Sequence, residues 1–154
     1  MSRGTERGSV SIEVAVLAPA FIALMVLAGV AGRSAVAAEA IEAAAHDAAR
    51  AASISRTASA ARAAAEDAAQ QQLDWQGLVC TKAPELTFTA LVAGERTRFD
   101  DAYVSTGENA TVTVTVSCVV SFKDITLSVL PGMLTENRIT ASFTSPLDRY
   151  RSRQ

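Results

Sequence analysis

The chain has 154 residues, a net charge of −2 and an aromatic content of only 5%. Its basic residues are scattered and its aromatic residues are few, so the basic patch with stacking aromatics of a nucleic-acid-binding protein is missing. The length suffices for one modest domain, but the apolar and alanine-rich N-terminal part leaves roughly 80 residues for a globular unit, which is small.

The N-terminus combines a short polar segment with a long apolar one. Residues 1–8 are mostly polar, whereas residues 14–32 carry no charge. At about 1.5 Å per residue, this run is roughly as long as the ~30 Å hydrocarbon core of a bilayer is thick. We therefore predict a transmembrane helix at 9–33, surrounded by membrane lipid. Pro19 removes one backbone hydrogen bond from this helix, so we expect a kink there.

An alanine-rich segment follows the apolar run. Nineteen of residues 35–69 are alanine, the best helix former, and neither glycine nor proline interrupts them. We predict that the membrane helix continues through an extracytoplasmic segment at 34–75, giving one helix that spans on the order of 90 Å. Three residues lower the helix propensity locally and mark a soft point: Ser53, Ser55 and Thr57.

After Gly77 the pattern changes from helix to strand. Apolar residues alternate with threonine or serine at 86–92, 110–122 and 138–146, and this period of two predicts strands. The segment 125–132 is a strand or a short helix. Residues 76–154 are therefore predicted to form a small β-rich domain of three or four antiparallel strands in a meander. The predicted fold class is α+β.

The second of these strands has one apolar face. The residues on that face are Val112, Val114, Val116 and Cys118, with threonines and a serine on the other. We expect the valine face to pack against the far end of the long helix, near Leu73 and Trp75. Trp75 is thus predicted to be a packing anchor between helix and sheet.

The two cysteines are Cys80 and Cys118. If the N-terminal run directs export, both lie outside the cytoplasm, where disulfides persist. A bond between them would stabilise the domain by about 4 kcal/mol on the chain-entropy model. The alternative is two separate thiols. No metal site is expected, because two distant cysteines and one remote histidine do not form a zinc ligand set.

Motifs for catalysis and cofactor binding are absent. The chain has no glycine-rich phosphate loop, HExxH, GxSxG or CxxC. His46 is expected to be a surface residue paired with Glu42 one helical turn away. The adjacent acids Asp100 and Asp101 are expected to lie in an ordinary polar loop. We therefore expect neither an enzyme nor a cofactor.

Ordinary export signals explain the N-terminus only in part. A secretory signal peptide fits the sequence AVA at 35–37, with a mature start at Ala38, but the apolar run is longer than the usual 7–15 residues. An uncleaved signal anchor, with the arginines inside, explains the length. Neither explains Glu13. Either would make the chain a secreted or membrane-anchored binding protein.

A third interpretation accounts for Glu13. The stretch RGSVSIEVAVLAPAFIALMVLAGVAGR, followed by AAHDAARAAS, resembles TadE-like minor pseudopilins of the tight-adherence (Tad/Flp) type IV pilus system. TadF and TadG-type proteins share much of this pattern. In the prepilin family a prepilin peptidase cuts after a glycine on the cytoplasmic side, and the fifth mature residue is glutamate. By this resemblance Gly8 ends the leader, Ser9 begins the mature chain and Glu13 is its fifth residue.

Charge explains why such a glutamate is tolerated. A carboxylate carried to mid-bilayer costs about 2.5–3.5 kcal/mol unless it finds a partner. Cleavage after Gly8 creates a positively charged α-amino group at Ser9. The resemblance implies that Glu13 of one subunit neutralises this amine on its neighbour.

The resemblance also implies partners and a location. The partners are a prepilin peptidase, other pilins or pseudopilins, and the Tad inner-membrane assembly proteins. The protein would cross the cell membrane once, with a cytoplasmic N-terminus and an extracytoplasmic C-terminal domain. A role in initiating or assembling a pilus or secretion apparatus follows, and incorporation into a surface pilus is a further option.

Overall fold

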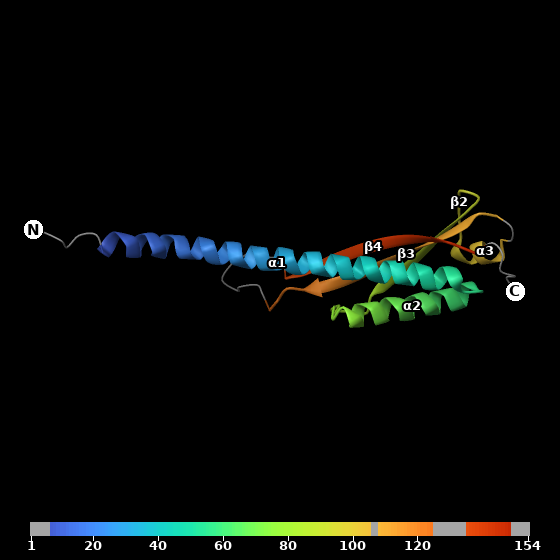
Figure 1. The fold of residues 1–154 in the computed structure, drawn as a ribbon, viewed down its shortest axis with the longest axis horizontal. Helices are drawn as coiled ribbons and strands as arrows, with labels where there is room; N and C mark the ends of the chain where they lie inside the picture. Colours follow the sequence, from blue (N-terminus) through green and yellow to red (C-terminus); the bar gives the residue numbers. More distant parts are fainter. Residues whose placement is uncertain (1–6, 106–107, 125–134, 149–154) are drawn as a thin grey trace, which may run out of the picture.

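The computed structural model describes residues 7–105, 108–124 and 135–148. It has an α+β fold, as predicted, with a long N-terminal helix followed by a four-stranded antiparallel sheet (Figure 1). In chain order the elements are α1 (Arg7–Ile54), α2 (Ala58–Trp75), β1 (Glu85–Val92), β2 (Glu95–Thr97), α3 (Phe99–Val104), β3 (Ala110–Ser121) and β4 (Glu136–Pro146).

The prediction of one continuous helix through 34–75 is wrong. Helix α1 ends at Ile54, and α2 folds back along α1 to form a helical hairpin (Figure 1). The break falls at the predicted soft point. The hydroxyl groups of Ser53 and Ser55 each donate to a backbone carbonyl one turn earlier, at 2.9 Å. Such bonds compete with the regular helix and favour its end.

Thr57 then starts the second helix. Its backbone is extended, with φ −127° and ψ 154°, and its hydroxyl oxygen accepts a hydrogen bond from the N–H of Ala60 at 3.2 Å. This is the N-cap arrangement that threonine favours. The same three residues that lower propensity therefore end one helix and begin the next.

Alanines form the contact between α1 and α2. Small side chains let the two helix axes approach closely, since interaxial distance depends on the residues at the contact. The alanines buried to at least 97% on the two helices are Ala37, Ala40, Ala44, Ala45, Ala48, Ala49, Ala52, Ala61, Ala65 and Ala69. The alanine-rich composition therefore serves a tight hairpin rather than a single slender rod.

The sheet has the strand order β2-β1-β3-β4. β1 and β2 form a hairpin whose two turn residues, Ala93 and Gly94, both have positive φ, as a type I′ turn requires. The chain then passes through α3 and pairs β3 with the other side of β1. The three predicted strands therefore pair in chain order, β1-β3-β4, as the predicted meander requires, and β2 is an additional edge strand that was not predicted. The three predicted strands are confirmed, and the segment 125–132 lies outside the described residues.

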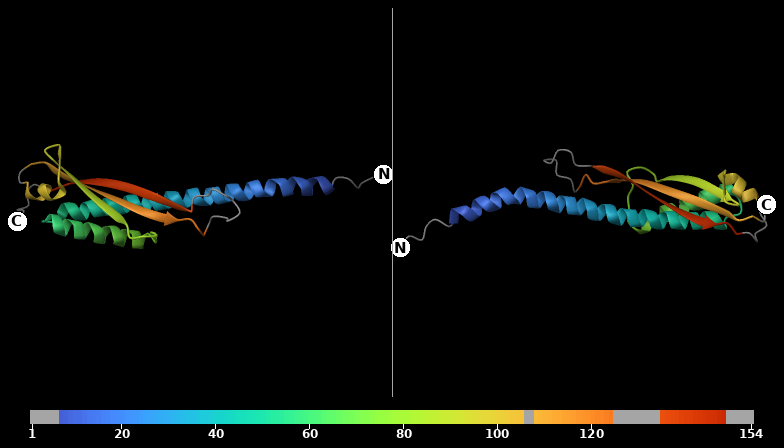
Figure 2. Two further views of the ribbon diagram at one scale, coloured as in Figure 1. Left: turned by 180° about the vertical axis from the view of Figure 1, so that it is seen from behind. Right: turned by 90° about the horizontal axis from the view of Figure 1, so that it is seen from above.

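The valine face of β3 is buried as predicted, but its partner is different. Val112, Val114, Val116 and Cys118 are at most 2% exposed. The element that packs on β3 and β4 is α1 (Figure 2). Trp75 does not anchor the sheet, because its side chain is 80% exposed.

Candidate membrane-anchoring and assembly site

The N-terminal part of α1 projects alone beyond the domain (Figure 1). The part of α1 that begins at Glu13 includes a stretch long and apolar enough to cross a membrane once. Most of its large apolar side chains are exposed in the described structure, and more than half of each of Val16, Phe21 and Met25 is accessible to solvent. This segment is a candidate single-pass membrane anchor.

The predicted processing and packing residues lie at the start of this helix. Gly8 and Ser9 are the second and third residues of α1, and Glu13 follows four residues after Ser9. Residues four apart share a helix face, so Glu13 and the backbone nitrogen of Ser9 lie on the same side. Glu13 is exposed, and none of the ion pairs among the described residues includes it.

Pro19 lies inside α1 without interrupting it. In the view from above, the helix axis bends within its N-terminal, dark blue part (Figure 2). A proline in a helix interior removes a hydrogen bond and its ring presses on the preceding turn, which is a recognised cause of bending. The helix tolerates this residue where no other element packs against it.

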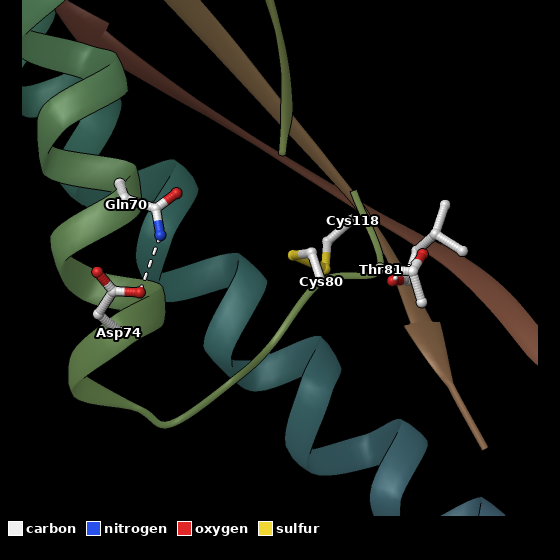
Figure 3. The surroundings of a disulfide bond; sticks show 6 residues. Gln70, Asp74, Cys80, Thr81 and Cys118 are labelled. Atoms are coloured by element: carbon white, nitrogen blue, oxygen red, sulfur yellow. Dashed lines mark hydrogen bonds between the residues drawn. A yellow bond between two sulfur atoms is a disulfide. The ribbon is translucent and has the colours of Figure 1, made fainter. Parts of the chain in front are cut away.

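Cys80 and Cys118 are joined by a disulfide, with their Cα atoms 5.6 Å apart. The bond ties the connection after α2 to the middle of the sheet (Figure 3). Beside it, the backbone N–H and the hydroxyl of Thr81 both donate to the carbonyl of Val119, at 2.8 and 3.1 Å. The α2–β1 connection is therefore held to β3 by one covalent bond and two hydrogen bonds.

A hollow of about 160 Å³ lies next to the disulfide. On one side Gln70 donates to the carboxylate of Asp74 at 2.8 Å (Figure 3). The volume is below the ~300–1,000 Å³ of typical small-molecule sites. Within the described part of the chain, no three His, Cys, Asp or Glu side chains gather as a metal site would require.

Asp100 does not lie in a simple loop. It stands in the first turn of α3 and accepts two hydrogen bonds from Arg62 of α2, at 2.8 and 3.0 Å. The guanidinium lies over the ring of Phe99, 4.8 Å from its centre. Hydrogen bonding to Arg62 lowers the pKa of the Asp100 carboxyl below its ordinary value. Sequence offered no signal for this pair, because 38 residues separate its members.

His46 is a surface residue, but its predicted pairing with Glu42 is wrong. Its Nδ1 lies 3.1 Å from an oxygen of Asp47, and its ring meets Phe143 of β4 edge-on at 4.5 Å. The imidazole therefore turns toward the sheet that packs on α1, rather than along the helix.

Arg33 marks the boundary between the two parts of α1. It ends the apolar run and forms an ion pair with Asp124, just beyond the end of β3. The hydrogen bond from Arg33 lowers the pKa of the Asp124 carboxyl. The first cation after the apolar run thus fastens the helix to the domain at the point where the helix leaves it. Its two members lie 91 residues apart, so local sequence carries no signal for the pair.

Comparison of the chain with protein-family models, curated proteins and solved structures gives no match. The functional argument therefore rests on the residues themselves. The decisive ones are Gly8 and Glu13 at the head of an exposed apolar helix.

Proposed function

We propose that this protein is a TadE-like pseudopilin that contributes to the assembly or initiation of a Tad/Flp-type pilus or secretion apparatus. A prepilin peptidase cuts it after Gly8, and α1 holds it in the membrane until it packs against other pilin-like subunits. One observation carries the proposal. An apolar helical segment, whose large side chains between residues 14 and 27 are at least half exposed in the described structure, begins with a carboxylate, Glu13, five residues after a glycine.

The exposed helix requires an apolar environment. Eight large apolar side chains between residues 14 and 27 are at least half exposed. Burying one such side chain is worth about 1.5–3 kcal/mol, so their exposure to water is strongly unfavourable in sum. Lipid supplies the apolar surroundings before assembly, and the helices of neighbouring subunits supply them afterwards.

Glu13 distinguishes this helix from a plain anchor. A plain anchor gains nothing from a carboxylate at the edge of its apolar run. A subunit interface does gain, because the α-amino group released at Ser9 is a matching charge on the same helix face. A neighbouring helix that reaches Glu13 therefore also meets this amine.

The position of the scissile bond suits a peptidase. Gly8 and Ser9 lie in the first turn of α1, where backbone N–H groups have no partner within the helix. Unwinding this turn breaks few hydrogen bonds. Glycine also lowers the cost of leaving the helix, because it is a poor helix former.

Contacts upstream of Ala38 support an intact α1 over a secreted form that begins there. Val30 packs against the core, Arg33 pairs with Asp124, and Ala37 is only 1% exposed. A signal peptidase cut after Ala37 would remove all three contacts from the folded domain.

Intact-mass measurement of membrane-extracted protein, with and without a co-expressed prepilin peptidase, tests the proposal. The wild type should lose residues 1–8, and Gly8→Val should retain them because a bulky side chain replaces the glycine at the cut. Gly4→Val is the matched control, since it changes the other leader glycine and should be cut like the wild type.

Each alternative result would contradict the proposal. A wild-type chain that keeps residues 1–8 in the presence of the peptidase is an uncleaved anchor. A chain that begins at Ala38 is a secreted protein. Equal processing of the Gly8→Val and Gly4→Val variants would show that Gly8 does not define the cut.

A further inference from the structure

The C-terminal end of α2 exposes two large apolar side chains. Trp75, the only tryptophan in the chain, is 80% exposed, and Val79, just past the turn, is 82% exposed. The turn itself is tightly held. Gly77 has φ +67°, and the N–H of Leu78 donates to the carbonyl of Leu73 at 3.0 Å. The exposure of Trp75 is therefore a property of a well-ordered helix end.

The helical hairpin carries this end back toward the membrane. α2 starts at Ala58 next to the end of α1 and runs antiparallel to it. At about 1.5 Å per residue, α2 descends roughly 26 Å, which brings Trp75 level with about residue 37 of α1. Figure 1 shows this end, in lime green, beside α1 on the side toward the bare helix, with the end of β3 reaching somewhat farther in the same direction. Trp75 is thus only about 6 Å farther along the helix axis than Arg33.

That level corresponds to the lipid headgroup layer. If residues 14–32 fill the hydrocarbon core, Arg33 lies at its outer boundary. The polar layer on each side of a bilayer is about 5–8 Å thick, from the difference between the ~30 Å core and the ~40–45 Å total. Tryptophan concentrates in this layer, because its ring is apolar and its indole N–H is a hydrogen-bond donor.

We propose that Trp75, together with Val79, is a second membrane contact that seats the extracytoplasmic domain on the headgroup layer of the outer leaflet. The inference rests on one part of the proposed function, that α1 spans the membrane. The domain then has two attachments to the bilayer, the helix itself and the end of α2. Two attachments fix how the domain is rotated about α1, which one helix alone does not.

Position, rather than exposure alone, points to lipid. Val104 in α3 is also 75% exposed. However, α3 lies near the connection between α1 and α2, at the end of the domain opposite the bare helix (Figure 1). Near Trp75 the neighbouring Asp74 is held by Gln70. Asp74 and Lys82 line the same hollow beside Val79, so the local charges are of both signs and attraction to anionic lipid is not what distinguishes this place; the exposed apolar side chains are.

The single tryptophan makes the contact measurable by its own fluorescence. The full chain is placed in phosphatidylcholine nanodiscs whose acyl chains carry bromine close to the headgroup, and its emission is compared with that in unbrominated nanodiscs. Bromine quenches indole only at close range. We expect Trp75 to lose emission in the brominated nanodiscs and to emit at shorter wavelength than in urea-unfolded chain.

Two relocated tryptophans provide controls in a Trp75→Phe background. Phe21→Trp places the reporter near the middle of the apolar run, about 18 Å from Arg33, so it is measured in nanodiscs brominated near the acyl-chain ends, where it should be quenched whenever α1 is in the bilayer. Val104→Trp places it at the far end of the domain, where it should keep its emission.

The outcomes separate this inference from the proposed function. Quenching at position 21 without quenching at position 75 would overturn the second contact and leave the membrane span intact. Loss of quenching at position 21 would remove the span and the contact together. Short-wavelength emission of Trp75 without bromine quenching would indicate burial against another protein surface, such as a second copy, and equal quenching at positions 75 and 104 would show no oriented seating. Each of these results contradicts the proposal.

Discussion

The two halves of α1 belong to one continuous helix but differ in which side chains are exposed and which are buried. In the first half, large apolar residues such as Leu24 are exposed, in this case to 61%. In the second half, small residues such as Ala44 are buried completely. The less hydrophobic half is therefore the one that forms the core of the folded domain.

The difference shows that shape, not hydrophobicity, decides which half the domain covers. Alanines leave a smooth helix surface on which α2 and the sheet pack closely, and interiors are built at high density. The large residues between 14 and 27 are at least half exposed in the described structure, which is why we propose that lipid or other subunits cover them. The boundary lies at Arg33, whose ion pair with Asp124 closes the packed half.

Removing the disulfide should have the largest effect, and only on the packed half. The Cys80→Ala/Cys118→Ala variant should lose about 4 kcal/mol in free energy of unfolding, because no cross-link then closes a loop between residues 38 apart in the unfolded chain. The apolar half of α1 should stay helical in micelles. Denaturant unfolding followed by circular dichroism measures both, as a lower midpoint and a residual helical signal.

Reductant provides the control for that variant. It should destabilise the wild type by a similar amount and leave the double alanine variant unchanged. Equal midpoints for oxidised wild type and double variant would contradict the expectation. Loss of the residual helix in the variant would show that the first half depends on the domain, and so would break the comparison.

A leucine placed in each half of α1 tests the packing argument directly. Ala48 is fully buried, so Ala48→Leu forces extra atoms into a close helix contact and should cost about 1–3 kcal/mol of stability. Ala31 is exposed in the apolar half, so Ala31→Leu should leave the unfolding midpoint of the domain unchanged. The two midpoints, measured in the same micelles, give the result. A similar shift for both variants would mean that the first half also packs within its own chain.

The elements could be predicted where local pattern decides them. Strict alternation in ATVTVTVSC predicted both the strand and its buried face, and the sheet confirms each of them. The helical hairpin could not be predicted in the same way, because alanine favours helix equally in a rod and in a hairpin. The low helix propensity at Ser53, Ser55 and Thr57 was visible in the sequence. Whether the helix ends there depends on tertiary contacts that the alanine composition does not reveal.

The candidate site divides along the same line. Gly8 and Glu13 were found from a local motif, and the structure adds that the helix beyond them is exposed. Trp75 was predicted to be a packing anchor between helix and sheet. Only the return of α2 along α1 reveals its exposed place, and that return depends on the unpredicted hairpin. The pair of Arg62 and Asp100 joins residues far apart in the chain and left no trace in local sequence.

The smallest expected effect concerns the ion pair that joins α3 to α2, the helix that packs along the second half of α1. Arg62 lowers the pKa of the Asp100 carboxyl, so the folded state binds a proton less readily than the unfolded chain. The stability from this pair is therefore fully present above the ordinary aspartate pKa of about 3.9 and is lost as the pH falls through the lower folded pKa. Asp100→Asn should unfold at a slightly lower temperature than the wild type at pH 7, and the difference should vanish in strong acid.

Asp101→Asn is the matched control, because the adjacent carboxylate makes no ion pair with the described residues. Thermal unfolding of the three proteins across this pH range separates a local ion pair from a general loss of negative charge. The effect is small because both partners are partly exposed and solvent screens exposed pairs. A pH-independent difference between Asp100→Asn and the wild type would contradict the role of charge. The contact that holds α3 would then be the packing of the Phe99 ring beneath the guanidinium of Arg62. Neutral packing, as along the alanine face of α1, would therefore also hold α3 against α2.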